Sequence, residues 1–264
     1  MKAITLLYHD VVLPGQSTAS GFNNPGSARY KLDVEEFSRH LRAIAQETRR
    51  VPSSIFTLLN SASASPHLLL TFDDGGSSAY TTIADLLESY GWRGHFFVTA
   101  NYIGTETFVT SEQIRELHKR GHVIGSHSCS HPDPMSQLTL EELVREWQVS
   151  TNILSEILGE QVNIASLPGG YYSPNVAKAA AMAGIKVLFT SYPTTRIHMV
   201  NGCAVFGRYT VWRGMAPTTA AQYAAGQFAA CAQQWLTWNA KGILKTLGGN
   251  WYLKQRERMS AAQK

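Results

Sequence analysis

The sequence predicts an α/β fold built around a mostly parallel sheet. Short apolar runs rich in β-branched and aromatic residues alternate along the chain with longer stretches of helical period, a pattern typical of βα units. Glycine follows several helical stretches at the point where a helix is expected to end. Periodicity alone does not separate a barrel from an open, doubly wound sheet, so the motifs must decide.

The predicted elements cover most of the chain. Strands are expected at residues 3–8, 68–72, 94–99, 123–126, 163–167, 186–190 and 204–208, and helices at 33–47, 78–90, 111–120, 139–158, 173–183 and 217–238. Thr139 and Glu142 form a capping-box arrangement, and Gly159 marks the end of the same helix. Residues 13–30 are rich in Gly, Ser, Asn and Pro and are expected to form a long loop.

Length and composition fit one globular domain over residues 1–264. The chain is 44% hydrophobic and 16% charged, which excludes a disordered or collagen-like protein. Cys129, Cys203 and Cys231 are far apart, so neither a disulfide framework nor a cysteine-based zinc site is expected. The N-terminal apolar run is too short for a signal peptide or an integral membrane segment, and a cytoplasmic location is the expectation.

Positive charge gathers in a basic C-terminal tail, residues 241–264. The tail has six Lys or Arg and one Glu, and the whole chain has a net charge of +4. Clustered cations attract anionic membrane surfaces or acidic partners, and a solvated helix end is the simpler interpretation. No basic stripe accompanies stacking aromatic residues elsewhere, so no nucleic-acid partner is expected. Nothing in the sequence indicates an oligomeric state.

Two adjacent carboxylates, Asp73 and Asp74, end the predicted strand 68–72 and are followed by Gly75 and Gly76. The C-terminal ends of strands form the edge where α/β proteins place their active sites. Successive side chains on a strand point to opposite faces, but a turn that begins at Gly75 can aim both carboxylates inward. A simple turn with an aspartate helix cap is the alternative.

His127 and His131 follow the predicted strand 123–126 and are four residues apart. On a helical turn this spacing places both imidazoles on one face, where they can bind one cation. Together with Asp74 they suit Zn²⁺, or Co, Mn or Ni, and leave positions open for water and substrate. Such an ion lowers the pKa of bound water from about 15.7 to about 7. Asp73, one residue from a ligand, is the natural base.

The motifs TFDDG and HSCSH resemble the first two motifs of the polysaccharide deacetylases, the NodB-homology group of carbohydrate esterases. The resemblance covers residues 66–210, and the two motifs together are highly specific. It implies a distorted, incomplete (β/α) barrel of about seven parallel strands. It also implies that Asp73 is the catalytic base and that Asp74, His127 and His131 bind the metal.

A third family motif, Arg-x-Pro-Tyr-Gly, corresponds to SLPGG at 166–170, with Ser166 in place of arginine. Pro168 is retained and Gly169 replaces the tyrosine, whose backbone N–H in the family helps to hold the oxyanion. Glycine keeps that N–H, so we expect Pro168, Gly169, Gly170 and Tyr171 to contact the substrate.

Two further residues complete the expected site. The missing motif arginine normally orients the catalytic aspartate, and Arg208, after a late strand, is the candidate substitute. The family also places a general-acid histidine near its C-terminus, and here LLYHD at 6–10 resembles that motif moved to the front. The same arrangement is found in permuted deacetylases that act on poly-β-1,6-N-acetylglucosamine. His9 is therefore the expected general acid, oriented by Asp10 or another carboxylate; a histidine that only packs is the alternative.

Other conspicuous residues have weaker interpretations. His122 and Cys129 are expected to be structural rather than metal ligands. Tyr171, Tyr172, Tyr192 and Trp212 lie near predicted strand ends, where they would either stack on sugar rings or fill the core.

The function that these residues predict is hydrolysis of the N-acetyl group of a hexosamine in a poly- or oligosaccharide, which releases acetate. Hydrolysis of another non-peptide amide or of an O-acetyl ester is the alternative within enzymes, since the third motif is altered. A metal-bearing carbohydrate-binding protein without turnover is the alternative outside enzymes.

Overall fold

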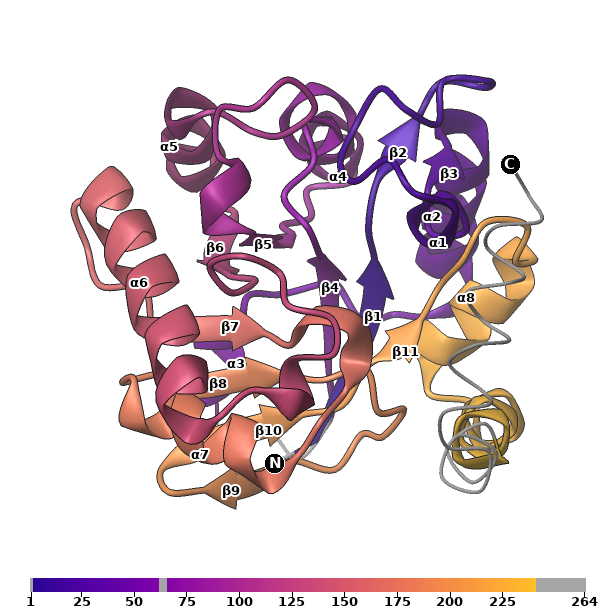
Figure 1. Ribbon diagram of the computed structural model, residues 1–264. Helices are drawn as coiled ribbons and strands as arrows, with labels where there is room; N and C mark the ends of the chain where they lie inside the picture. Colours follow the sequence, from indigo (N-terminus) through magenta and orange to yellow (C-terminus); the bar gives the residue numbers. More distant parts are fainter. Residues whose placement is uncertain (1, 62–65, 241–264) are drawn as a thin grey trace.

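A computed structural model describes residues 2–61 and 66–240. The predicted basic tail lies outside the described residues. At the centre is a nine-stranded sheet in the order β11-β1-β4-β5-β6-β7-β8-β10-β9, in which only the pair β10–β9 is antiparallel (Figure 1). The strands are β1 (Ala3–Tyr8), β4 (His67–Phe72), β5 (His95–Val98), β6 (Val123–Ser126), β7 (Ile164–Ser166), β8 (Val187–Phe189), β9 (His198–Val200), β10 (Cys203–Phe206) and β11 (Tyr209–Thr210).

All seven predicted strands are present in this sheet. The structure adds the short strands β9 and β11, and a separate parallel pair formed by β2 (Val11–Val12) and β3 (Leu32–Asp33). These additions are two or three residues long, too short to give a periodic signal in the sequence.

Helices pack on the outside of the sheet, as Figure 1 shows for α5, α6 and α7, whereas the short helix α3 packs Ile55 and Leu58 into the core inside the barrel. The helices are α1 (Pro25–Ala28), α2 (Val34–Glu47), α3 (Ile55–Leu59), α4 (Ala84–Glu88), α5 (Ser111–Lys119), α6 (Leu140–Leu158), α7 (Pro174–Met182) and α8 (Pro217–Ala225). A π-helical turn, Ala79–Ile83, leads into α4. The expected capping box between Thr139 and Glu142 begins α6, and Gly159 ends it with φ +72°.

Two predictions near the chain ends need correction. The segment 13–30 is mostly loop, but it contains the four-residue helix α1. The prediction of one helix over 217–238 is wrong, because Gly226 (φ +69°) ends α8 and a second helix occupies 228–240. A left-handed glycine cannot continue the helical backbone.

The sheet curls into a partly closed barrel, which confirms the predicted fold. The chain passes directly from β10 to β11 through Gly207 and Arg208, yet β10 pairs with β8 and β11 pairs with β1. Two strands far apart in the sheet order are thus joined by two residues, so the sheet must bend round on itself. Arg208 lies in this closing seam.

Strand alternation divides the buried side chains into two sets. One set forms the core inside the barrel: Leu69, Phe97, Val123, Ile164, Val187, Phe189 and Phe206. The other set packs against the helices and includes Leu68, Leu70, Phe96, Ile124, Ala165, Leu188 and Val205. The inward parity continues through the strand ends to Asp73, His127, Ser166 and Arg208. The pleat therefore brings these four together inside one end of the barrel.

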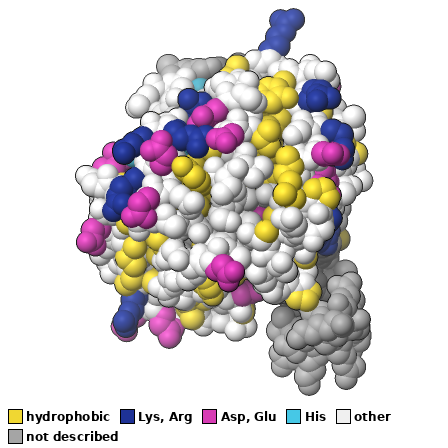
Figure 2. Space-filling model, turned by 90° about the horizontal axis from the view of Figure 1, so that it is seen from above, with side chains coloured by type: hydrophobic (Ala, Val, Ile, Leu, Met, Phe, Trp, Pro, Cys, Tyr) yellow, Lys and Arg dark blue, Asp and Glu magenta, His cyan; other side chains and the backbone are white. Residues whose placement is uncertain are grey.

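The outer surface carries charges of both signs. Figure 2 shows acidic and basic side chains interspersed on the face seen from above, with hydrophobic side chains between them. No helix in the described part of the chain is both long and apolar enough to cross a membrane.

Candidate metal centre and active site

The three predicted metal ligands come together at the C-terminal ends of β4 and β6. Nε2 of His127 lies 3.4 Å and Nε2 of His131 3.6 Å from Oδ1 of Asp74, and one ligand atom from each residue falls within 4.8 Å of the others. Ligand atoms roughly 2.1 Å from a tetrahedral ion would be about 3.4 Å apart. The arrangement therefore fits a divalent cation. Asp74 reaches it because its φ of +77° turns the carboxylate inward.

The ring of His127 is oriented from behind. Its Nδ1 lies 3.0 Å from the backbone oxygen of Ser166, which can only accept, so Nδ1 carries the proton. The Ser166 hydroxyl lies 2.9 Å from the same nitrogen. In the neutral ring, the form that can bind a metal, Nε2 is then unprotonated and faces Asp74 with a free lone pair; in the protonated ring Nε2 donates to Asp74 instead. This is the usual arrangement of a metal-binding histidine, whose second nitrogen is held by a carbonyl or carboxylate.

A carboxylate on α6 holds the turn between the two histidines. Oε2 of Glu146 accepts from the backbone N–H groups of Cys129 and Ser130, both at 2.9 Å, and Oε1 accepts from the Ser130 hydroxyl at 2.8 Å. The turn includes two non-glycine residues with positive φ, Ser128 at +64° and His131 at +58°, a backbone conformation that needs support from its surroundings. Sequence reasoning missed Glu146, because it is one of several glutamates on a long helix.

Asp73 is held by Arg208. The guanidinium donates from Nη1 to Oδ1 at 2.7 Å and from Nη2 to Oδ2 at 2.8 Å. Its remaining N–H groups bond to the hydroxyls of Thr71 and Ser166 and to the backbone oxygen of Thr190. All five donors of a fully buried arginine are therefore used. This is the position that the sequence analysis assigned to Arg208.

Both carboxylates remain charged despite their burial. Burial alone would raise the pKa of Asp73, but the positive charge of Arg208, aided by His127, holds that pKa below its usual value. For Asp74, burial is again outweighed, here by the hydrogen bond with His127 and the charges of His9, His127 and His131, so its pKa is well below normal. An anionic pair of this kind suits one ligand and one base.

His9 follows β1 at the same end of the barrel, and its charge acts on both aspartates. Its ring stacks on Tyr30, with centroids 4.7 Å apart. Nδ1 of His9 is buried without a hydrogen-bond partner. Asp10 does not orient this ring: Oδ1 of Asp10 accepts from the hydroxyls of Ser20 and Ser78, and Oδ2 has no partner. The expectation for Asp10 is therefore wrong, whereas Tyr30, in the long loop region, is the ring contact.

The segment that corresponds to the third motif is a tight turn directly after β7, Pro168–Gly170. Gly169 and Gly170 both have positive φ, +62° and +71°. A Cβ on Gly169 would also lie 3.2 Å from Oδ1 of Asp133. Glycine in place of the family's tyrosine is therefore favoured by the backbone, and a side chain here would be strained.

Three other residues named in the sequence analysis, His122, Cys129 and Trp212, have contacts away from the cation group. His122 accepts from the Gly94 N–H and contacts Glu88, and burial lowers its pKa to about 4, so it is structural. The Cys129 thiol donates to Oδ1 of Asn101, away from the cation group. Trp212 packs partly buried against the core, with Arg29 over its ring.

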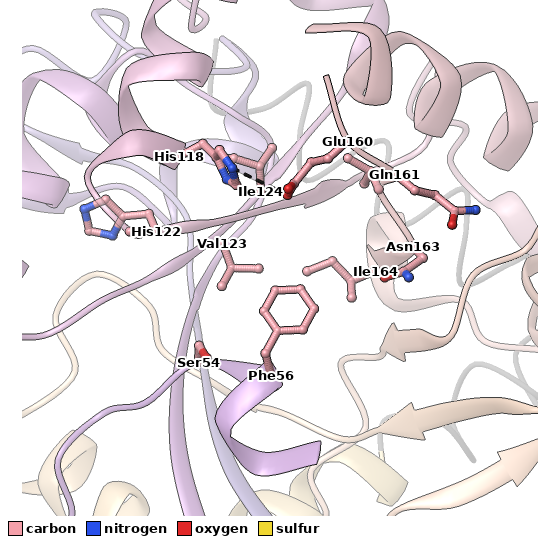
Figure 3. Close-up of a pocket in the computed structure, with 12 residues that line it drawn as sticks. Ser54, Phe56, His118, His122, Val123, Ile124, Glu160, Gln161, Asn163 and Ile164 are labelled. Carbon is pink, nitrogen blue, oxygen red and sulfur yellow. Dashed lines mark ion pairs between the residues drawn. The ribbon is translucent and has the colours of Figure 1, made fainter. Parts of the chain in front are cut away.

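A cavity of about 190 Å³ lies at the opposite end of the barrel from this site. Figure 3 shows it between the starts of β6 and β7, with Phe56 of α3 close to Val123 and Ile164, and with the ion pair of His118 and Glu160 (3.5 Å) on its rim. The ligand histidine and Ser166 lie at the other ends of these same strands. The candidate site thus lies at the C-terminal edge of the sheet, where α/β barrels usually place their active sites.

Comparisons with known proteins agree with this fold. Residues 60–188 match the family model for polysaccharide deacetylase. Over 126 residues the chain is 30% identical to the peptidoglycan-N-acetylmuramic acid deacetylase PdaA of Bacillus subtilis, which covers 47% of this chain and 46% of that protein. The match thus spans about half the length of the curated relatives.

Solved structures show the same barrel. The Streptococcus pyogenes deacetylase PplD, in complex with acetate, has a TM-score of 0.68 at 22% identity, over 82% of this chain and 95% of that one. IcaB from Ammonifex degensii has a TM-score of 0.66 at 21% identity, over 85% and 96%. The fold is that of the deacetylase barrels. Residues 60–188 match the model of the polysaccharide deacetylase family, which confirms the resemblance seen in the sequence.

Proposed function

We propose that this chain is a metal-dependent N-deacetylase that hydrolyses the acetamido group of N-acetylhexosamine units in a poly- or oligosaccharide. The observation that carries the proposal is the separation of roles between adjacent aspartates. Asp74 lies between two imidazoles as a ligand would, while both oxygens of Asp73 accept from Arg208, which holds this carboxylate beside the cation group. A cation site with a second, fixed carboxylate beside it suits hydrolysis of an acyl group.

The cation site would take Zn²⁺, or Co²⁺, Mn²⁺ or Ni²⁺, on Asp74, His127 and His131. When bound, the ion supplies Lewis acidity toward the acetyl carbonyl and makes water more acidic. Asp73, which lies 3.9 Å from Nε2 of His127, accepts the proton of the attacking water. Arg208 fixes the direction of that carboxylate and keeps it ionised before the reaction.

Two other groups serve the carbonyl oxygen and the leaving amine. The Gly169 N–H, on a turn fixed by two positive-φ glycines, donates to the developing oxyanion. His9 donates a proton to the amine as the carbon–nitrogen bond breaks, with its ring held by Tyr30. The products are acetate and a free amino sugar, and the proton taken up by Asp73 balances the one that His9 gives.

The altered turn favours a second candidate substrate. Gly169 has no side chain where the family has tyrosine, so the site should leave more space beside the acyl group of the substrate. An O-acetyl ester or another non-peptide amide is therefore the alternative substrate for the same machinery.

Acetate release from chito-oligosaccharides tests the proposal. We expect activity to disappear on chelation and to return on addition of Zn²⁺ or Co²⁺. Asp73→Asn should retain the metal, measured by elemental analysis, but lose at least a hundredfold in kcat, and His9→Ala should lose about 10²- to 10⁴-fold because it removes a general acid. Near-wild-type rates in Asp73→Asn would exclude it as the base; release only from acetyl esters would favour the alternative.

A further inference from the structure

Exposed aromatic side chains border the candidate active site on the side of β8. Tyr192 is 37% exposed and Trp235 is 42% exposed. Nε1 of Trp235 donates to the Tyr192 hydroxyl at 2.7 Å. Because the indole N–H and the phenol oxygen bond to each other, the surface that the two residues expose to solvent consists mainly of their apolar ring faces.

The pair is continuous with the residues proposed for catalysis. Tyr192 lies just beyond the C-terminal end of β8, and its backbone oxygen accepts from the Arg208 N–H at 2.9 Å. Trp238, on the same helix as Trp235, reaches the third-motif turn, since a Cβ on Gly170 would lie 3.2 Å from its ring. The aromatic pair thus lies next to the proposed oxyanion turn.

The helix that carries Trp235 and Trp238 is fixed in place. Residues 228–240 form the gold helix below α8 in Figure 1. Gln234 donates to the backbone oxygen of Thr210 at 2.9 Å and accepts from the Thr210 N–H at 3.0 Å. The nitrogen and the oxygen of this one side-chain amide thus attach the helix to β11. The aromatic faces are therefore positioned before any ligand arrives, which reduces the entropy lost on binding.

We propose that Tyr192 and Trp235 form a stacking platform for pyranose rings of the saccharide that flank the unit being deacetylated. The C–H face of a β-linked pyranose is flat and apolar, and it matches an exposed aromatic face whose polar edge is already satisfied. Scattered hydrophobic residues are normal on a surface, but paired aromatic faces next to a reactive centre are typical of ligand sites. The inference rests on the proposed function and extends it to chains longer than one sugar.

Chain-length dependence of turnover tests the platform. The measured quantity is the ratio of kcat/KM for the β-1,4-linked N-acetylglucosamine tetramer to that for the dimer. Loss of one aromatic contact in Trp235→Ala or Tyr192→Ala should lower this ratio roughly two- to twelvefold. Trp235→Phe, which keeps a stacking face, should recover part of the loss. Leu236→Ala is the matched control, because Leu236 is 60% exposed on the same helix but points about 100° away.

Fluorescence titration with the tetramer separates the platform from the deacetylase activity. Wild-type protein should bind the tetramer with a change in tryptophan emission, and Trp235→Ala should bind it several-fold more weakly. If wild type binds in this way but releases no acetate, the proposed function fails and the platform stands. If acetate is released but Trp235→Ala leaves both the ratio and the affinity unchanged, the platform is refuted. An emission change that follows protein concentration instead of sugar assigns the face to a second copy and also refutes it.

Discussion

Replacement of Arg208 is the most decisive perturbation of this site. Arg208→Met removes the guanidinium but keeps an unbranched apolar chain in the seam between β10 and β11. Asp73 would then be buried, 5% exposed, with neither of its two charge-assisted hydrogen bonds. Leaving one partner of a buried ion pair unpaired costs about 3–5 kcal/mol of folding stability. We therefore expect the free energy of unfolding of Arg208→Met to fall by about that amount.

The same substitution should reduce turnover. Without Arg208, burial would raise the pKa of Asp73, and the carboxylate would no longer have a fixed direction. Loss of an oriented general base costs about 10²- to 10⁴-fold, so kcat/KM for acetate release should fall by at least a hundredfold. Arg208→Lys keeps the charge but not the two-pronged donor geometry and should fall between wild type and Arg208→Met.

Two comparisons make the test specific. The double variant Arg208→Met/Asp73→Asn carries no unpaired charge, so it should be more stable than Arg208→Met alone, as measured by urea unfolding. Arg39→Met is the control, because its ion pair with Glu35 is largely exposed and such pairs contribute only about 0–1 kcal/mol. Wild-type stability and kcat/KM in Arg208→Met would refute the reasoning.

Two further predictions concern the metal turn and acid stability. Glu146→Gln should weaken Zn²⁺ binding about 10- to 100-fold, as measured by calorimetry. The reason is that both oxygens of Glu146 accept hydrogen bonds from the turn, whereas glutamine has only one accepting oxygen. Glu141→Gln, exposed on the same helix, is the control, and equal Zn²⁺ affinities in the two variants would exclude a role for Glu146. Burial lowers the pKa of His95 and of His122 to about 4, below the usual value of about 6.5, so between pH 6.5 and 4 the unfolded chain binds protons that the folded chain does not. Stability should therefore fall as the pH falls through this range, by up to about 1.4 kcal/mol per pH unit for each group; urea unfolding that is level or rises from pH 6.5 to pH 5 would contradict this.

The sequence predicted the parts of the fold that depend on local pattern. Every strand of four or more residues in the central sheet was found from its apolar run, and Thr139 and Gly159 marked the ends of α6. The break at Gly226 was missed because apolar and alanine-rich residues continue on both sides of it. Residues 13–30 were correctly expected to be mostly loop, but the contact between Tyr30 and His9 could not be predicted, because it forms only on tertiary folding.

The site divides in the same way. Asp73, Asp74, His127 and His131 were recognisable because motif spacing along the chain defines them. Glu146 and Trp235 were not, since each acts on a residue brought close only by tertiary folding: Glu146 on the turn 129–130, and Trp235 on Tyr192, 43 positions away in the chain. Asp10 was misassigned because successive side chains at the end of a strand point to opposite faces, so a residue next to His9 in sequence need not contact its ring.

The exchange of the motif arginine for Arg208 follows from the barrel itself. Ser166 and Arg208 both point inward, and the Ser166 hydroxyl lies 3.2 Å from Nη2 of Arg208, which is 2.8 Å from Asp73. An arginine at position 166 would thus compete with Arg208 for the same carboxylate, and two buried guanidinium groups beside one aspartate would leave a charge unpaired. The small hydroxyl instead accepts from Arg208 and lies against Nδ1 of His127, so one side chain links the proposed base to a proposed metal ligand. Ser166 leaves the space that the Arg208 guanidinium occupies and accepts one of its hydrogen bonds. The absence of the motif arginine at position 166 and the presence of Arg208 beside Asp73 are therefore two sides of the same structural arrangement.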